Sequence, residues 1–107
     1  MSNGQDTRAV FVTAPSTEVA QTLAQACVNI IPGLTSVYEW EGKVQSDSES
    51  LLMIKTSDSK LSKLSEWVVQ NHPYDVPEVI ALPIQGGSES YINWIKETLK
   101  KAPIVKE

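Results

Sequence analysis

The stretches CVNIIPGLTSVYEW (27–40) and KVQSDSESLLMIKT (43–56) are separated only by Glu41 and Gly42. A two-residue connection that ends in glycine is typical of a tight β-hairpin, so the two stretches are predicted to run out and back as paired strands. The turn fixes a register in which the following residues face each other: Trp40 and Lys43, Tyr38 and Gln45, and Ile30 and Met53.

The two halves of this hairpin differ in polarity. The inner half, 28–31 against 51–54, is apolar on both faces and is predicted to belong to a core. Pro32-Gly33 interrupts the outgoing strand and predicts a bend or bulge. The outer half is polar from 44 to 50, although Tyr38 and Trp40 share one face. The hairpin reaches roughly 45 Å, beyond what a small domain covers, so another surface must cover its aromatic side chains.

The remaining sequence predicts three helices and two further strands. The apolar run 9–13 predicts a buried strand, and residues from Ser16 or Thr17 to about 26 predict a short helix. A helix is expected from Asp58 or Ser59 to the residue before Pro73, with Trp67 on its apolar face. A strand is expected at 76–82, in which Pro77 marks either an edge strand or a strand start. A last helix is predicted from Ser88 to Pro103, with four residues on its buried side: Tyr91, Ile92, Ile95 and Leu99.

The order β-α-β-β-α-β-α predicts an α+β fold. It is a ferredoxin-like split βαβ sandwich with a long central hairpin and an extra C-terminal helix. The 107 residues fit one domain at 9–102, between a flexible N-terminal tail (1–8) and a C-terminal tail (103–107).

Composition excludes several classes of function. The net charge of −4 and the absence of a basic stripe argue against nucleic acid as a partner. The lysines at 96, 100 and 101 are better explained as cations at a helix C-terminus. The single cysteine favours a reducing compartment. The polar residues 1–7 do not resemble a secretory signal, and no apolar run is long enough for membrane insertion, so we expect a cytoplasmic protein.

Three stretches resemble the CutA divalent-ion tolerance family: ACVNIIP at 26–32, YEWEGKV at 38–44 and HPYDVPEVIALPI at 72–84. With the FVTAP start and the SYINWI helix, the resemblance covers nearly all of the chain after residue 8. It implies a ferredoxin-like domain assembled into a homotrimer through its hairpins. It further implies a role in tolerance to divalent metals, with copper binding, and in animals the anchoring of a membrane-associated esterase.

The chain departs from the family in two places. The segment between Pro15 and Cys27 is shorter than the family's first helix by roughly eight residues, about two turns. Ala14 stands where several bacterial relatives carry a cysteine, which removes one candidate metal ligand. The first departure predicts a thinner helical layer and lower stability than in full-length relatives.

Cys27 and His72 are the metal-ligand candidates, because copper(I) favours thiolate and imidazole. Each also has a structural explanation. A lone cysteine in an apolar strand is usually a small core residue. A histidine before a proline can cap the end of the preceding helix.

A second set of residues is carried over by the resemblance to a cleft between subunits: Tyr38, Trp40, Lys55, Tyr74 and Glu78. A lysine, a carboxylate and aromatic rings can hold a polar or anionic ligand, and interface packing with a salt bridge is the alternative.

The hairpin carboxylates, which are Glu39, Glu41, Asp47 and Glu49, are interpreted as solvated charges that block edge pairing. No nucleophile elbow, phosphate loop or HExxH motif occurs, so an enzyme is not expected. The sequence therefore favours a metal-binding tolerance protein, and a trimeric regulatory or docking module is the alternative.

Overall fold

The computed structural model describes residues 6–15 and 27–101. The strands are β1 (Thr7–Ala14), β2 (Cys27–Trp40), β3 (Lys43–Ser57) and β4 (Val79–Pro83). The helices are a 3₁₀ turn η1 (Asp58–Lys60), α2 (Leu61–Asn71) and α3 (Glu89–Lys101). The short helix expected before Cys27, and the stability prediction that depends on it, lie outside the described residues.

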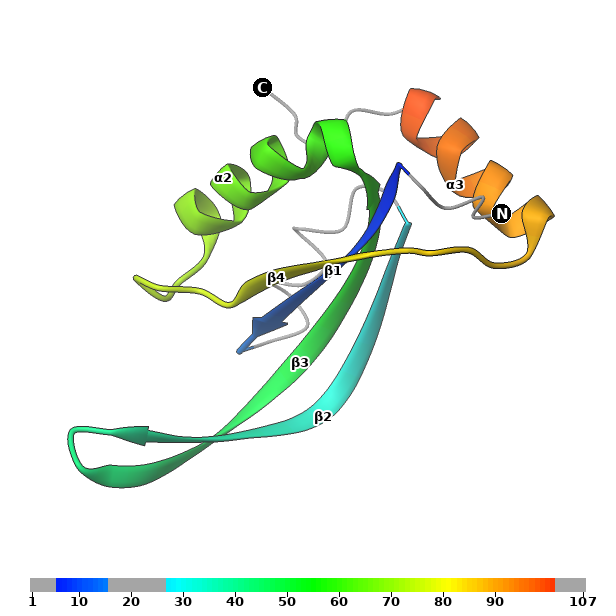
Figure 1. The fold of residues 1–107 in the computed structure, drawn as a ribbon. Helices are drawn as coiled ribbons and strands as arrows, with labels where there is room; N and C mark the ends of the chain where they lie inside the picture. The colour runs from blue at the N-terminus through cyan, green and yellow to red at the C-terminus, as the bar shows by residue number, and fades with distance from the viewer. Residues whose placement is uncertain (1–5, 16–26, 102–107) are drawn as a thin grey trace.

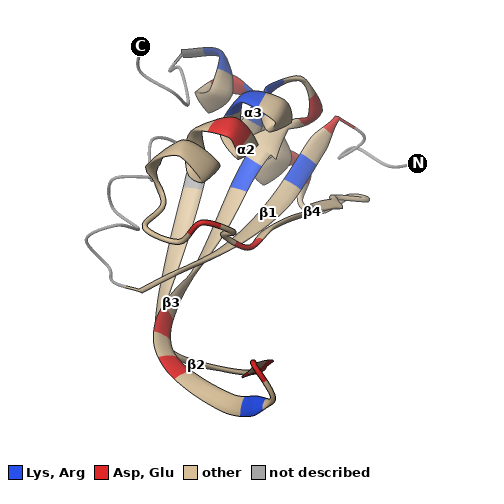
Figure 2. Ribbon diagram, turned by 90° about the vertical axis from the view of Figure 1, so that its left-hand side faces the viewer, with Lys and Arg blue, Asp and Glu red and all other residues tan. Residues whose placement is uncertain are grey.

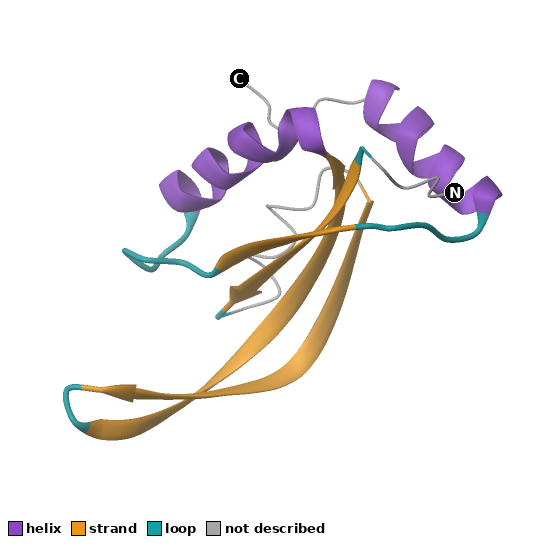
Figure 3. Cartoon of the chain, in the orientation of Figure 1, coloured by secondary structure: helices purple, strands orange, loops and turns teal. Residues whose placement is uncertain are grey.

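The four described strands form one antiparallel sheet in the order β2-β3-β1-β4. β1 and β2 are both antiparallel to β3, so they run parallel to each other with β3 between them. This arrangement is the split βαβ pairing predicted from the sequence. Both described helices lie over the same face of the sheet, while the β2–β3 hairpin extends well beyond β1 and β4 (Figures 1 and 3).

The core lies between this face and the helices because inward-facing apolar residues alternate along β1 and β3. Its buried members are Val10, Val12, Ala14, Leu52, Ile54, Leu64, Val68, Ile92, Ile95 and Leu99.

The hairpin turn has the predicted form, with positive φ at Glu41 (52°) and Gly42 (78°), so Trp40 pairs with Lys43 and Tyr38 with Gln45. The prediction that Ile30 faces Met53 was wrong. Ile30 pairs with Leu52, because the register shifts by one residue between Ile31 and Leu34, at the bulge predicted there.

The bulge determines which side chains reach the core. Without the extra residue, Ile30 would pair with Met53, whose side chain lies on the face of β3 opposite the described helices. With it, Val28 pairs with Ile54 and Ile30 with Leu52, and both β2 side chains pack against the core. Gly33 adopts φ +80°, a left-handed conformation that favours glycine, and this allows the chain to turn at the bulge.

Three local predictions needed correction. Neither Asp58 nor Ser59 caps the second helix, because these residues form η1 and α2 starts after Lys60 without a side-chain cap. The edge strand begins at Val79 because Pro77 lies before it and cannot donate to the ladder. Tyr91 is 45% exposed on α3 and stacks on Trp94 with ring centroids 5.7 Å apart.

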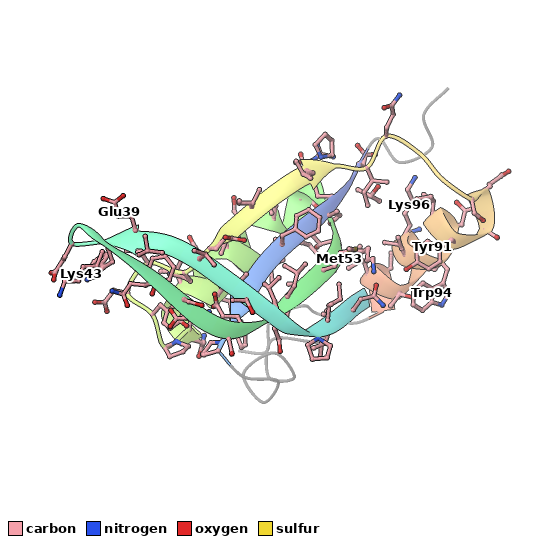
Figure 4. The ribbon with its side chains drawn as sticks, turned by 90° about the horizontal axis from the view of Figure 1, so that it is seen from below. Glu39, Lys43, Met53, Tyr91, Trp94 and Lys96 are labelled. Atoms are coloured by element: carbon pink, nitrogen blue, oxygen red, sulfur yellow. The ribbon has the colours of Figure 1, made fainter. Side chains whose placement is uncertain are left out.

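The other face of the sheet carries apolar side chains that no described helix covers. Phe11, Leu51 and Met53 on this face are half-buried, and Ile31, Ile80 and Leu82 are 42–51% exposed. We call these six residues the open sheet face; Figure 4 views the molecule from this side, with Met53 labelled. The inner half of the hairpin was predicted to be core on both faces, whereas within one chain only the helix-covered face is core. Among the described helices, none has the length and apolar character of a membrane span.

Candidate functional site

Two carboxylates on β3 meet two tyrosines where the hairpin leaves the sheet. The last residue pair between β1 and β3 is Ala14–Ser50, and Glu49 and Asp47 follow on alternate positions of β3. The Tyr38 hydroxyl donates to Asp47 Oδ2 at 2.6 Å, and the Tyr74 hydroxyl donates to Glu49 Oε2 at 3.4 Å. Figure 2 shows the acidic positions at this bend of β3. These four residues are the tyrosine–carboxylate cluster.

His72 anchors the loop that carries Tyr74. Pro73 disfavours further helix, so His72 is extended, and its backbone N–H donates to the Val68 carbonyl at 2.8 Å. The Tyr74 N–H donates to His72 Nδ1 at 3.1 Å, and His72 Nε2 lies 2.8 Å from the Thr13 carbonyl oxygen. A ring nitrogen that accepts a hydrogen bond carries no proton, so Nε2 carries the proton and donates to Thr13.

This geometry leaves the His72 imidazole without a spare nitrogen. The side chain is 7% exposed, and the Tyr74 ring lies against it with centroids 4.8 Å apart. A metal ion bound by His72 would have to displace one of the two backbone partners. In this structure His72 therefore holds the end of α2 and Tyr74 against the end of β1.

The pKa values of both phenols are raised above the ordinary value of 10.0. For Tyr38, the main cause of the raised pKa is the hydrogen bond to Asp47, which the deprotonated phenol would lose. For Tyr74, the main cause of the raised pKa is burial, followed by the charge of Glu49. Both effects favour the protonated phenol, so the two hydroxyls remain hydrogen-bond donors at neutral pH.

Replacing Asp47 by alanine is expected to lower the pKa of Tyr38 toward 10.0, because its main cause is removed, and to lower that of Tyr74 by less. In the parent chain, the folded phenols keep their protons at a pH where the unfolded phenols release theirs. Their contribution to stability is therefore complete below pH 10.0 and decreases as pH rises through the folded pKa values. Tyrosine ring chemical shifts measured against pH give these values. Glu39→Ala is the control, and equal Tyr38 titration in all three proteins would contradict the prediction.

The structure brings together two of the five residues predicted to line a ligand cleft. Tyr38 and Tyr74 meet at the cluster. Trp40 is 62% exposed next to the hairpin turn, and Glu78 is exposed just before β4. Lys55 lies toward the other end of β3, where its ammonium group donates to Asn29 Oδ1. Within one chain these five residues do not form a single site, and their predicted meeting between subunits stays a prediction.

The predicted metal ligands are far apart within one chain. Cys27 pairs through its backbone with Lys55, whereas His72 contacts Thr13, which pairs with Leu51. Four residues along β3 span roughly 13 Å, and Cys27 and Thr13 lie on opposite sides of that strand. A metal ion held by both residues would need two copies of the chain. Within the part of the chain that the structure describes, no three His, Cys, Asp or Glu side chains gather as a metal site.

Sequence reasoning missed the partners of the two tyrosines. Asp47 and Glu49 were interpreted as solvated charges, but Glu49 is 8% exposed and Asp47 is half-buried beneath Tyr38. A signal was present in the register. Tyr38 faces Gln45, so the diagonal neighbour on the same face is Asp47, within reach of a long side chain.

The architecture defines a class: an α+β protein with a ferredoxin-like sheet, one helix-covered face and a hairpin that extends well beyond the other strands (Figure 1). The chain belongs to the CutA1 divalent ion tolerance protein family, whose model matches residues 8–98. Solved structures of CutA1 from Oryza sativa and CutA from Synechococcus elongatus PCC7942 are similar, with TM-scores of 0.83 and 0.84 at 51% and 30% identity. The match covers 91% of this chain and 96% of the Oryza chain, and 92% and 94% for Synechococcus.

Curated relatives agree with this assignment. The chain is 58% identical over 99 residues to the chloroplastic protein CutA of Arabidopsis thaliana, covering 85% of this chain and 54% of that protein. It is 49% identical over 96 residues to the divalent-cation tolerance protein CutA of Thermus thermophilus, covering 82% and 93%. The chain thus spans little more than half the length of the Arabidopsis, rice and cattle relatives. The family is named for tolerance and not for a catalysed reaction.

Proposed function

We propose that this chain is a homotrimeric, cytoplasmic protein of divalent-metal tolerance and that its metal sites are shared between subunits. The open sheet face carries the proposal of assembly. Six apolar side chains on one face, three of them 42–51% exposed, form a contiguous patch of the kind that another protein surface covers. The protruding hairpin, with Trp40 62% exposed and Tyr38 44% exposed, adds a second uncovered apolar surface. The number three comes from the family resemblance.

Shared metal sites follow from the distances within one chain. Cys27 and His72 are too far apart to bind one ion together, and both His72 ring nitrogens face backbone groups. Assembly places side chains of different subunits next to each other and supplies the missing ligands. The direct test is the mass of the purified chain by light scattering at micromolar concentration, followed by titration with copper and zinc. A stable monomer would contradict the assembly, and an assembled protein without metal affinity would contradict the metal role.

Copper(I) binding is expected to be weak and to depend on Cys27. The thiolate is the soft ligand that copper(I) prefers, and zinc should bind less tightly. Cys27→Ser should remove measurable copper(I) affinity, whereas His72→Ala should weaken it by less because the imidazole already contacts Thr13 and Tyr74. Competition with a chromogenic copper(I) chelator measures both variants. Unchanged affinity in Cys27→Ser would place the site elsewhere.

The alternative is a regulatory or docking module. The tyrosine–carboxylate cluster favours it, because two protonated phenols and two carboxylates present both donors and acceptors on a partly exposed surface. Such a surface suits a polar small ligand or a protein partner, of which the anchoring of a membrane-associated esterase is the example that the resemblance supplies. Metal titration separates the two functions, since this one requires no affinity for metal.

A further inference from the structure

A pocket whose lining residues are mostly polar or charged lies at the opposite end of the sheet from the tyrosine–carboxylate cluster. Its walls come from the beginning of β1, the end of β3 with η1, and α3, and its volume is about 700 Å³. Small-molecule sites usually occupy about 300–1,000 Å³. The pocket includes Ser57, eight residues along β3 from Glu49, which is roughly 26 Å at strand rise. None of the residues assigned above to a metal ion, a cleft or the open sheet face lines this pocket.

Three lysines line this pocket, from two different walls. Lys96 and Lys100 are four residues apart on α3, so they project from the same side of the helix. In Figure 4, Lys96 lies between α3 and the strands. Lys60 comes from η1, and its ammonium group donates to the Leu99 carbonyl, which ties η1 to α3. Three of the nine basic residues of a chain with net charge −4 thus line one open pocket.

Neutral donors accompany these cations. Ser57 and Ser59 line the pocket, with their hydroxyl oxygens 3.1 Å apart, and Asn93 adds an amide from α3. Ammonium, hydroxyl and amide groups all donate hydrogen bonds, and charge-assisted bonds to phosphate are the stronger kind. This set of donors suits the oxygens of a phosphate group.

The other lining residues narrow the class of ligand. Asp6 and Glu97 also face the pocket, and carboxylates accept hydrogen bonds from hydroxyl groups. Glu97 contacts Lys100 at 3.2 Å, but both side chains are more than 60% exposed, so a ligand can replace this weak pair. No aromatic ring is among the described lining residues, so a nucleobase would find no stacking surface there.

We propose that this pocket binds a small phosphorylated, hydroxyl-rich molecule of the sugar-phosphate class. The lysines and serines hold the phosphate, and Asp6 and Glu97 accept from the hydroxyls. The proposal rests on neither the metal role nor the trimer, so it can fail or succeed independently of them.

The test is amide NMR titration of the full chain with glucose 6-phosphate, inorganic phosphate and glucose, with affinities from calorimetry. Glucose 6-phosphate should shift amides of Ser57, Ser59 and Asn93. Lys96→Gln should weaken the affinity for glucose 6-phosphate by about tenfold or more, since one charge-assisted hydrogen bond to the ligand is lost. Lys63→Gln is the matched control, because Lys63 is exposed on α2 and does not line the pocket. Far-ultraviolet circular dichroism should show both variants folded.

Three results would overturn the proposal. One is the absence of these shifts at millimolar glucose 6-phosphate, and another is equal weakening by Lys63→Gln, which marks nonspecific charge attraction. The third is inorganic phosphate that binds as tightly as glucose 6-phosphate, which would leave an anion site without recognition of hydroxyl groups. A Ser59→Ala variant tests the neutral donors separately. It should bind glucose 6-phosphate less tightly than the parent chain does, and glucose should shift no amides.

Discussion

Replacing Met53 by glutamate is expected to prevent assembly while each subunit stays folded. Met53 lies on the open sheet face, paired with Phe11 on β1 and Asn29 on β2. In a single subunit the new carboxylate can remain hydrated, because no helix in the described part of the chain covers this face. Against a second subunit the charge would be buried without a partner, and such burial costs about 3–5 kcal/mol. Association should therefore weaken by two orders of magnitude or more.

Light scattering and sedimentation measure the mass of this variant, and circular dichroism verifies its fold. Ser62→Glu is the matched control, because it adds the same charge to an exposed position on α2, at the helix-covered side of the sheet. The control should assemble like the parent. If Met53→Glu assembles equally well, the open sheet face is not the surface that joins the subunits.

Replacing Leu52 by alanine is expected to destabilise the fold itself, with a large loss of stability. Leu52 is next to Met53 in the sequence, but its side chain lies on the other face of β3. Leu52 is 0% exposed and belongs to the core beneath α2 and α3. Removing a buried leucine to alanine costs about 2–5 kcal/mol, because apolar contacts are lost and a cavity remains. The melting temperature should fall by at least about 8 °C for a domain of this size.

Thermal unfolding of parent and variant must be compared at one protein concentration, because assembly itself stabilises the folded state. Val69→Ala is the control, since Val69 is 52% exposed on α2, and its effect should stay within about 0.5 kcal/mol. A Leu52→Ala protein that melts with the parent would show that the core collapses around the missing side chain without cost. The two substitutions therefore distinguish assembly from folding at adjacent positions: Met53→Glu should affect assembly, and Leu52→Ala should affect folding stability.

The alternating pattern and the turn made most of the sheet predictable from the sequence. Glu41-Gly42 determined the outer register, and the prediction remained correct as far as the bulge. It failed at Ile30 because Pro32-Gly33 identified a bulge without saying how many residues it inserts. Counting one extra residue on β2 would have placed Val28 beside Ile54 and Ile30 beside Leu52. In that register these four apolar side chains share one face of the sheet.

The candidate site was less predictable because it depends on contacts between distant segments. Tyr74 reaches Glu49 across 25 positions of sequence, after a loop that His72 fixes to Thr13. Local patterns describe neither the course of this loop nor the burial of Glu49. The lysines of α3 were explained by the helix dipole alone, because their proximity to Lys60 and Ser57 appears only once η1 is packed against α3.

The bulge separates the domain into two parts whose dimensions can vary independently. Inner pairings depend on the residues before Pro32, and outer pairings are counted from the turn at Glu41-Gly42. An insertion of one residue on each strand beside the turn lengthens the hairpin by about 3.4 Å and leaves every inner pair in place. An insertion on one strand alone changes the register and moves Tyr38 away from Asp47. Hairpin length is thus a quantity that evolution or an engineer can change in paired steps, altering how far the chain reaches toward a neighbour without redesigning its core.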